Sequence, residues 1–317
     1  MLREDLLAIL TPVARPLVID RAYRDSNDPR IQSLAYSADG RYLATGGYDN
    51  TAKVWDAGTH QLLGKPFAHF GAVHDVSLNE DGSRLLTASA DRTAAVWDTA
   101  TGEELATFRD HNTSVNSGVI SRDGTIAVTG GADGETRVWD ATDGTQRRHW
   151  TDCASQVFGV ALSPDSRQIA VGCGDSNVYL RSVDSDERID LPNEHAAEVT
   201  GVAFSPDGRL LVSASKDRTA IVWNLETRQV VQRLTGHADR VHNAAFSADG
   251  TQVATASWDK TARLWDLAEP GSYRSFSGAA DRVIDVAFNP VRGEFGTAAY
   301  DGAILSLIHI SEPTRPY

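Results

Sequence analysis

The sequence lacks the features that stabilise small secreted domains or anchor a chain in a membrane. Its 317 residues include only two cysteines, Cys153 and Cys173, too few for a framework of several disulfides. We expect two free thiols in a reducing cytoplasm, with a single disulfide as the alternative. No apolar run approaches the roughly 18 residues of a membrane-spanning helix, and residues 1–10 lack the pattern of a signal peptide. The expected location is therefore cytoplasmic, with no membrane partner.

Basic charge is also scarce. The chain has 43 acidic and 30 basic residues, which gives a net charge of −13, and only four of the basic residues are lysines. Binding to a phosphate backbone depends on clustered positive charge. The composition therefore argues against a nucleic-acid partner.

What the sequence has in abundance is a fixed repeat. Aspartates recur every 42 residues, at Asp49, Asp91, Asp133, Asp175, Asp217, Asp259 and Asp301. Tryptophan stands six residues after five of them, at Trp55, Trp97, Trp139, Trp223 and Trp265. A period of this length indicates one supersecondary unit that is copied and stacked. A residue present in every copy more often has a structural role than a catalytic one.

Residues 69–110 illustrate the unit. Alternating apolar residues and turn residues predict strands at 73–78, 84–89, 93–98 and 104–108, joined by short turns. Connections this short permit only an antiparallel meander. Stacked radially, seven such sheets bury both faces against their neighbours. We predict an all-β, seven-bladed β-propeller of four-stranded antiparallel blades whose last blade is incomplete.

The repeat resembles that of the WD-repeat β-propeller family. The resemblance implies a tetrad in each blade, in which histidine, Ser or Thr, the turn aspartate and tryptophan form hydrogen bonds with one another. Four repeats have the complete set: His69, Thr87, Asp91 and Trp97; His111, Thr129, Asp133 and Trp139; His195, Ser213, Asp217 and Trp223; and His237, Thr255, Asp259 and Trp265. We assign structural roles to all sixteen residues.

Repeat four departs from the pattern. Cys153, Val171 and Arg181 stand where histidine, Ser or Thr, and tryptophan are expected, and Asp175 alone remains. Joint loss is reasonable because a partly satisfied buried network is worse than an apolar core. The cysteines are interpreted as replacements inside a degenerate blade, since two cysteines without suitably spaced histidines do not make a zinc site. The sequence predicts no metal, no cofactor and no catalytic residue.

The two ends of the chain fall outside the repeat. Residues 1–26 are expected to form a helix and linker, and Pro16 to Arg24 could add an outer strand to the last blade. The propeller is assigned to residues 27–304. Tryptophan is due at position 307, but the chain has Leu307, and residues 305–315 resemble the translated adapter of a sequencing library. We interpret 305–317 as non-native sequence, so the seventh blade should lack its native third and fourth strands.

We call the set of 42 equivalent positions in each repeat the repeat frame. Candidate binding residues stand at frame positions where the residue differs from one repeat to the next. In WD-repeat propellers three frame positions face the narrow entrance of the ring. They are the third and fifth residues after the histidine position and the residue before the turn aspartate. In repeats six, seven and one, which would be adjacent in a closed ring, these positions include Arg240, His242, Trp258, Arg282, Tyr300, Arg30 and Tyr48. Arginine and aromatic residues dominate interface hot spots. On an acidic chain, such a patch suggests a protein or peptide partner that is acidic or phosphorylated.

The sequence thus favours a non-catalytic scaffold or sensor module, monomeric as a propeller and part of a larger regulatory protein. The alternative is a propeller enzyme or small-ligand-binding domain with its site at the central funnel. Non-repeating residues gathered at the axis would favour that alternative.

Overall fold

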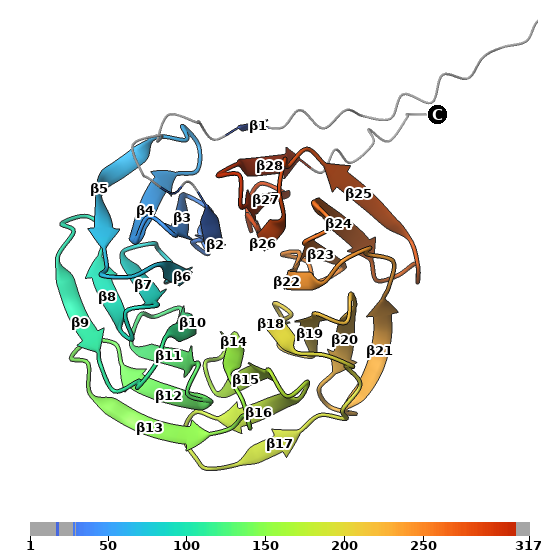
Figure 1. The fold of residues 1–317 in the computed structure, drawn as a ribbon, viewed down its shortest axis with the longest axis horizontal. Helices are drawn as coiled ribbons and strands as arrows, with labels where there is room; N and C mark the ends of the chain where they lie inside the picture. The colour runs from blue at the N-terminus through green and yellow to red at the C-terminus, as the bar shows by residue number, and fades with distance from the viewer. Residues whose placement is uncertain (1–16, 19–27, 29, 309–317) are drawn as a thin grey trace, which may run out of the picture.

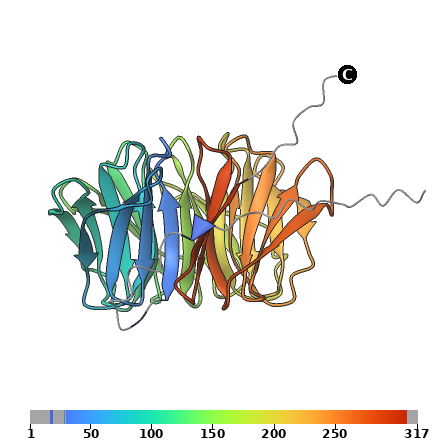
Figure 2. The same ribbon diagram turned by 90° about the horizontal axis from the view of Figure 1, so that it is seen from above.

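The computed structural model describes residues 17–18, 28 and 30–308, which form a ring of seven antiparallel sheets (Figure 1). Seen edge-on, the ring is a thick disc with strands running across its thickness (Figure 2). The predicted seven-bladed, all-β propeller is confirmed. Within the described ranges no helix is long and apolar enough to cross a membrane.

The first four blades follow one another along the chain. Blade one contains β2 (Ile31–Tyr36), β3 (Tyr42–Gly47), β4 (Thr51–Asp56) and β5 (Leu62–Ala68). Blade two contains β6 (Val73–Leu78), β7 (Arg84–Ser89), β8 (Ala94–Asp98) and β9 (Glu104–Phe108). Blade three contains β10 (Val115–Ile120), β11 (Ile126–Gly131), β12 (Glu135–Asp140) and β13 (Gln146–Thr151). Blade four contains β14 (Val157–Leu162), β15 (Gln168–Cys173), β16 (Val178–Ser182) and β17 (Arg188–Asp190).

The remaining three blades complete the ring. Blade five contains β18 (Val199–Phe204), β19 (Leu210–Ser215), β20 (Ala220–Asn224) and β21 (Gln229–Leu234). Blade six contains β22 (Val241–Phe246), β23 (Gln252–Ser257), β24 (Thr261–Asp266) and β25 (Tyr273–Ser277). Blade seven contains β26 (Val283–Phe288), β27 (Glu294–Ala299), β28 (Ile304–Ile308) and β1 (Leu17–Val18). The first strand of each blade lies at the centre of the ring (Figure 1).

The periodic aspartate organises the turn between the second and third strands. In blade two, Oδ1 of Asp91 accepts the backbone N–H of Thr93 at 2.9 Å and its hydroxyl at 2.6 Å, while Oδ2 accepts the N–H of Phe70 at 2.9 Å. Arg92 takes a left-handed conformation, with φ of 75°, to complete the turn. The third strand of this blade, β8, begins at Ala94, one residue later than predicted.

The four tetrads are joined by short hydrogen bonds. The distance from histidine Nε2 to the Ser or Thr hydroxyl is 2.7–2.8 Å, and that from the indole nitrogen to the same hydroxyl is 2.8–2.9 Å. Histidine Nδ1 lies 2.8–2.9 Å from the turn aspartate. Each set therefore links the second and third strands, the turn between them and the segment before the first strand.

Blade three shows the direction of these bonds. The indole N–H of Trp139 can only donate, so the hydroxyl of Thr129 accepts from it and donates to Nε2 of His111. The Nδ1–H of His111 then donates to Asp133. Burial lowers the pKa of His111 despite the opposing effect of Asp133, which keeps the neutral imidazole that this chain of donors requires.

Blade four replaces the tetrad with a covalent link. Cys153 and Cys173 form a disulfide, so the expectation of two free thiols is wrong. The physical reason is visible in blade three, where a Cβ added to Gly131, the counterpart of Cys173, would lie 2.5 Å from Nδ1 of His111. The two frame positions are spatial neighbours, and the Cα atoms of the cysteines are 5.5 Å apart.

An ion pair fills the place of the missing tryptophan in blade four. The guanidinium of Arg181 lies 2.6 Å from Oδ1 of Asp152, and their side chains are 10% and 0% exposed. Oδ2 of Asp152 is buried without a hydrogen-bond partner among the described residues. The degenerate blade thus has an Arg–Asp ion pair where its neighbours have a hydrogen-bonded tetrad.

A belt of polar residues joins the first strands around the axis. One frame position supplies its members: Ser33, Asp75, Ser117, Gly159, Gly201, Asn243 and Asp285. Asp75 accepts the hydroxyls of Ser33 and Ser117 at 2.8 Å, and Asn243 donates to Asp285. Blades four and five have glycine in this position, and a Cβ on Gly159 would lie 3.1 Å from the Cα of Gly201. There the two strands approach too closely for side chains.

Blade seven closes the ring with both ends of the described chain. β28 pairs with β27, so Ile304–Ile308 occupies the third-strand position that we expected the blade to lack. β1 pairs with β28, with Leu17 opposite Ser306, and supplies a two-residue outer strand from the segment expected to do so. The rest of that segment, the expected N-terminal helix and residues 309–317 lie outside the described residues. The interpretation of 305–317 as non-native stays a prediction.

Side-chain and backbone bonds seal the junction between blades seven and one. The N–H of Leu34 donates to Asp285 at 2.8 Å, and the amide of Asn289 donates to the carbonyl of Gly40 at 3.1 Å. Arg292 donates to the carbonyl of Ala57 at 2.8 Å.

Candidate functional site

One face of the disc carries a repeated backbone contact. In every blade the residue after the second strand donates its N–H to the carbonyl of the residue before the first strand, at 2.8–3.1 Å. We call this the entrance face. In three blades the bonded pair is an arginine and an aromatic residue: Arg240 with Trp258, Arg282 with Tyr300, and Arg30 with Tyr48. Blades two to four have small or amide residues in these places, and blade five has Glu198 and Lys216.

The three pairs lie in adjacent blades, because the first strands β22, β26 and β2 contact one another in that order. With His242, they form what we call the arginine–aromatic cluster: Arg30, Tyr48, Arg240, His242, Trp258, Arg282 and Tyr300. The structure therefore brings together the residues that the repeat frame selected.

Stacking connects the members of the cluster. The guanidinium carbons of Arg240 and Arg282 lie 4.2 Å and 4.0 Å from the ring centre of Trp258. Arg282 also lies 5.9 Å from the ring of Tyr300, so it bridges two blades. These distances are within the range of cation–π attraction. Trp258 is thus the centre of the cluster.

The blade-one side of the cluster is built in the same way. Arg30 lies 3.9 Å from the ring centre of Tyr48 and 5.9 Å from that of Tyr300. The rings of Tyr48 and Tyr300 meet edge to face at 5.9 Å. Burial, and then the hydrogen bond with Tyr48, raises the pKa of Tyr300, so the phenol of Tyr300 is uncharged at neutral pH.

The three arginines differ in how their charge is balanced. Arg30 binds Asp28 through two nitrogens. Arg240 is 3.9 Å from Asp239, beyond hydrogen-bonding distance, and 37% of its side chain is exposed. Within the part of the chain that the structure describes, no carboxylate lies within 4 Å of the Arg282 guanidinium. Positive charge is therefore available at Arg240 and Arg282 and largely neutralised at Arg30.

His242 supports Trp258 and carries no charge of its own. Its ring stacks on Trp258 with centroids 6.4 Å apart, and Nδ1 donates to the carbonyl of Ile284 at 3.0 Å. Burial lowers the pKa of His242 to about 4, so the ring is neutral at pH 7. The indole N–H of Trp258 is buried with no partner among the described residues. Stacking, not a polar anchor, holds this tryptophan.

Sequence reasoning missed one residue of this face. Phe70 is fully exposed in the segment before β6, at a frame position where the other described blades have alanine, asparagine or aspartate. Comparing that position across repeats would have revealed it. Conversely, Ile284, the counterpart of His242 in repeat seven, is completely buried and cannot contact a partner.

The described residues contain no group of three or more His, Cys, Asp or Glu side chains that could hold a metal ion. The four framed histidines are each engaged in a tetrad, in four different blades.

Comparison with known families agrees with the geometry. Residues 30–306 match the family described as IFT122 first beta-propeller. The chain belongs to this family. Membership suggests a protein-interaction module, which is the coarse form of the function expected from the sequence. No curated protein matched the chain.

Proposed function

We propose that this propeller is a non-catalytic scaffold or sensor module that binds an acidic or phosphorylated peptide segment of a protein partner. The segment would lie on the entrance face, across blades six, seven and one. The single observation that carries the proposal is the pair of arginines stacked on Trp258, whose charges lack a carboxylate at hydrogen-bonding distance within the described chain.

The geometry favours an anion flanked by apolar groups. Stacking on the indole fixes the planes of Arg240 and Arg282 while leaving their N–H groups available. A preorganised guanidinium loses less conformational entropy on binding a carboxylate or phosphate, and it can do so through two parallel hydrogen bonds. The exposed surfaces of Tyr48 and Tyr300 would contact neighbouring side chains of the same peptide.

The proposal is tested with defined probes. Fluorescence polarisation would measure the affinity of a labelled peptide containing several glutamates, its phosphoserine counterpart, and a neutral glutamine version. We expect Trp258→Ala to weaken the anionic peptides about thirtyfold, since truncating a hot-spot residue costs roughly 2 kcal/mol. Arg240→Ala should weaken them about tenfold.

Arg209→Ala is the matched control, because Arg209 lies in a turn of the opposite face with 84% of its side chain exposed. Its affinity should equal that of the wild type. If the neutral peptide binds as well as the anionic ones, or if neither cluster variant weakens binding, the proposal is wrong.

Location and assembly remain part of the proposal. A cytoplasmic location is compatible with the disulfide, because Cys153 and Cys173 are 4% and 0% exposed and so shielded from cellular thiols. The molar mass measured by light scattering would test whether the propeller is a monomer in solution. Alkylation of cell lysates under denaturing conditions would show whether the pair is oxidised in the cell.

A further inference from the structure

The face opposite the entrance face has a pocket at the centre of the ring. The first strands end there, and two adjoining cavities of about 230 Å³ and about 320 Å³ open between them. Both are lined by Ile120, Arg122, Pro206 and Phe246. Residues from both sides of the ring line the larger cavity, so it lies over the axis. We call the two cavities together the mouth pocket.

An apolar ring forms the wall of the mouth pocket. The last residue of each first strand contributes to it: Tyr36, Leu78, Ile120, Leu162, Phe204, Phe246 and Phe288. None of these side chains is charged at neutral pH, and four are aromatic. Polar side chains also line it: Ser121, Ser163, Ser166 and Ser205 in the smaller cavity, and Ser37, Ser77 and Asn79 in the larger. A concave site with apolar walls and some polar groups is the usual form of a small-ligand site.

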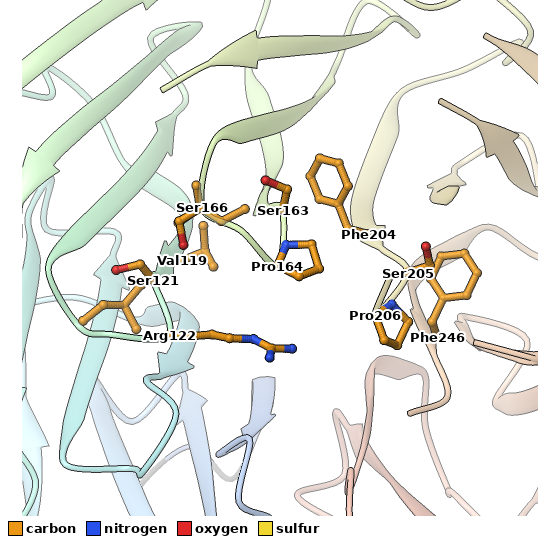
Figure 3. A pocket seen from close by; sticks show the side chains of 12 residues that line it. Val119, Ser121, Arg122, Ser163, Pro164, Ser166, Phe204, Ser205, Pro206 and Phe246 are labelled. Carbon is orange, nitrogen blue, oxygen red and sulfur yellow. The ribbon is translucent and has the colours of Figure 1, made fainter. Parts of the chain in front are cut away.

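The rim of the pocket holds one cation. Two residues beyond each first strand stand Ala38, Glu80, Arg122, Pro164, Pro206, Ala248 and Pro290. Figure 3 shows the side chain of Arg122 extended from blade three toward Pro206 on the far side of the smaller cavity. No carboxylate lies within 4 Å of this exposed guanidinium among the described residues.

We propose that the mouth pocket binds an apolar group the size of one aromatic ring or short alkyl chain that carries a single carboxylate. The apolar part would lie against Phe204 and Phe246, and Arg122 would hold the carboxylate. Volumes at the lower limit of ligand pockets admit one such group and exclude a folded partner. A guanidinium pairs with a carboxylate through two parallel hydrogen bonds, which fix the orientation of the bound group.

Glu80 is the charged group that opposes such a ligand. It lines the larger cavity from blade two, and its backbone N–H donates to the carbonyl of Arg122 at 2.9 Å. Among the described residues, the Glu80 carboxylate makes no ion pair with Arg122 within 4 Å. Its negative charge therefore repels a bound carboxylate but leaves the Arg122 guanidinium free to pair with one. Removing its charge should therefore tighten the binding of a carboxylate.

The same chemistry can come from a free acid or from the C-terminal residue of a peptide, and the probes separate these sources. Isothermal titration would compare 3-phenylpropanoate with 3-phenylpropanamide, and a short peptide ending in phenylalanine with its C-terminal amide. We expect at least one carboxylate to bind about tenfold or more tighter than its amide, the usual contribution of a charged hydrogen bond.

Three variants give the decision. Arg122→Gln should remove the preference for carboxylate, Glu80→Gln should increase affinity several-fold, and Arg209→Gln, an exposed arginine outside both cavities, should change nothing. A preference confined to the free acid identifies a small molecule as the source, and one shared by the peptide identifies a chain end.

The proposal is overturned if neither carboxylate binds at millimolar concentration, if the amides bind equally well, or if Arg122→Gln keeps the preference. Its outcome is independent of the entrance face, because Trp258→Ala should leave binding to the mouth pocket unchanged.

Discussion

Replacing Thr129 with valine should destabilise the protein by about 2–6 kcal/mol. The hydroxyl of Thr129 is completely buried and lies 2.8 Å from both Nε2 of His111 and the indole nitrogen of Trp139. Valine has nearly the same shape but neither donates nor accepts. Two buried polar groups would therefore lose their partner, and each such loss costs about 1–3 kcal/mol.

Blade three also contains the matched control. Thr136 is as completely buried as Thr129, but its hydroxyl has no hydrogen-bond partner among the described residues. Thr136→Val makes the same chemical change and removes an unsatisfied group instead of a satisfied one. It should leave stability unchanged or raise it by about 1 kcal/mol.

Urea unfolding followed by tryptophan fluorescence and by circular dichroism would measure both variants. Coincident transitions allow the midpoints to be converted to free energies. Equal losses of stability in Thr129→Val and Thr136→Val would refute the reasoning. The replacement of a buried hydroxyl by a methyl group would then explain both losses, whether or not the hydroxyl was hydrogen-bonded. A loss confined to Thr129 would establish the tetrad as the source.

Three further predictions concern blade four and the polar belt. Cys153→Ala should lower stability by about 3 kcal/mol, the chain-entropy contribution of a bridge between residues 20 apart, and a reductant added under denaturing conditions should have no further effect on this variant. Arg181→Ala should cost about 3 kcal/mol, because it leaves the buried Asp152 with only Arg188, 3.9 Å away, as an ion-pair partner, and Asp152→Asn in the same background should restore part of the loss in a thermal melt. Burial raises the pKa of Asp285 to about 7, so the native state keeps a proton that the unfolded state has lost between about pH 4 and about pH 7. Its stabilising contribution should fall as pH rises through that window, and the urea midpoint of Asp285→Asn should lack this part of the pH dependence.

The repeat frame predicted most of the fold because each frame position has one structural task. Residues 84–89 were assigned to a strand from their pattern, and β7 has those limits. The aspartates and tryptophans could be located from one sequence because the same contacts recur in blade after blade. The role of a residue such as Arg240 is harder to predict from sequence. Only the folded propeller shows that its guanidinium stacks on the indole of Trp258 and that no carboxylate lies at hydrogen-bonding distance.

The disulfide was missed for a related reason. Cys153 stands at a position that four other repeats fill with histidine, and Cys173 at one that the other repeats fill with serine, glycine or alanine, so the sequence shows two independent substitutions. Their proximity follows from strand pairing, in which Cys173 lies opposite Val157. The mouth pocket could not be predicted either, because it exists only where the ends of strands from the whole ring converge.

The bonds that seal blade seven to blade one have a consequence for how the ring is made. Leu34 and Asp285 are 251 residues apart in the chain, and Asn289 and Gly40 are 249 apart. During synthesis blade one emerges long before blade seven. The apolar side of blade one that packs against blade seven therefore stays exposed to solvent until the other blades have formed. Contacts of such long range slow folding, and the uncovered strands are open to pairing with another chain. Damage to this junction should therefore appear first as low yield and aggregation during expression, even where the finished ring is stable.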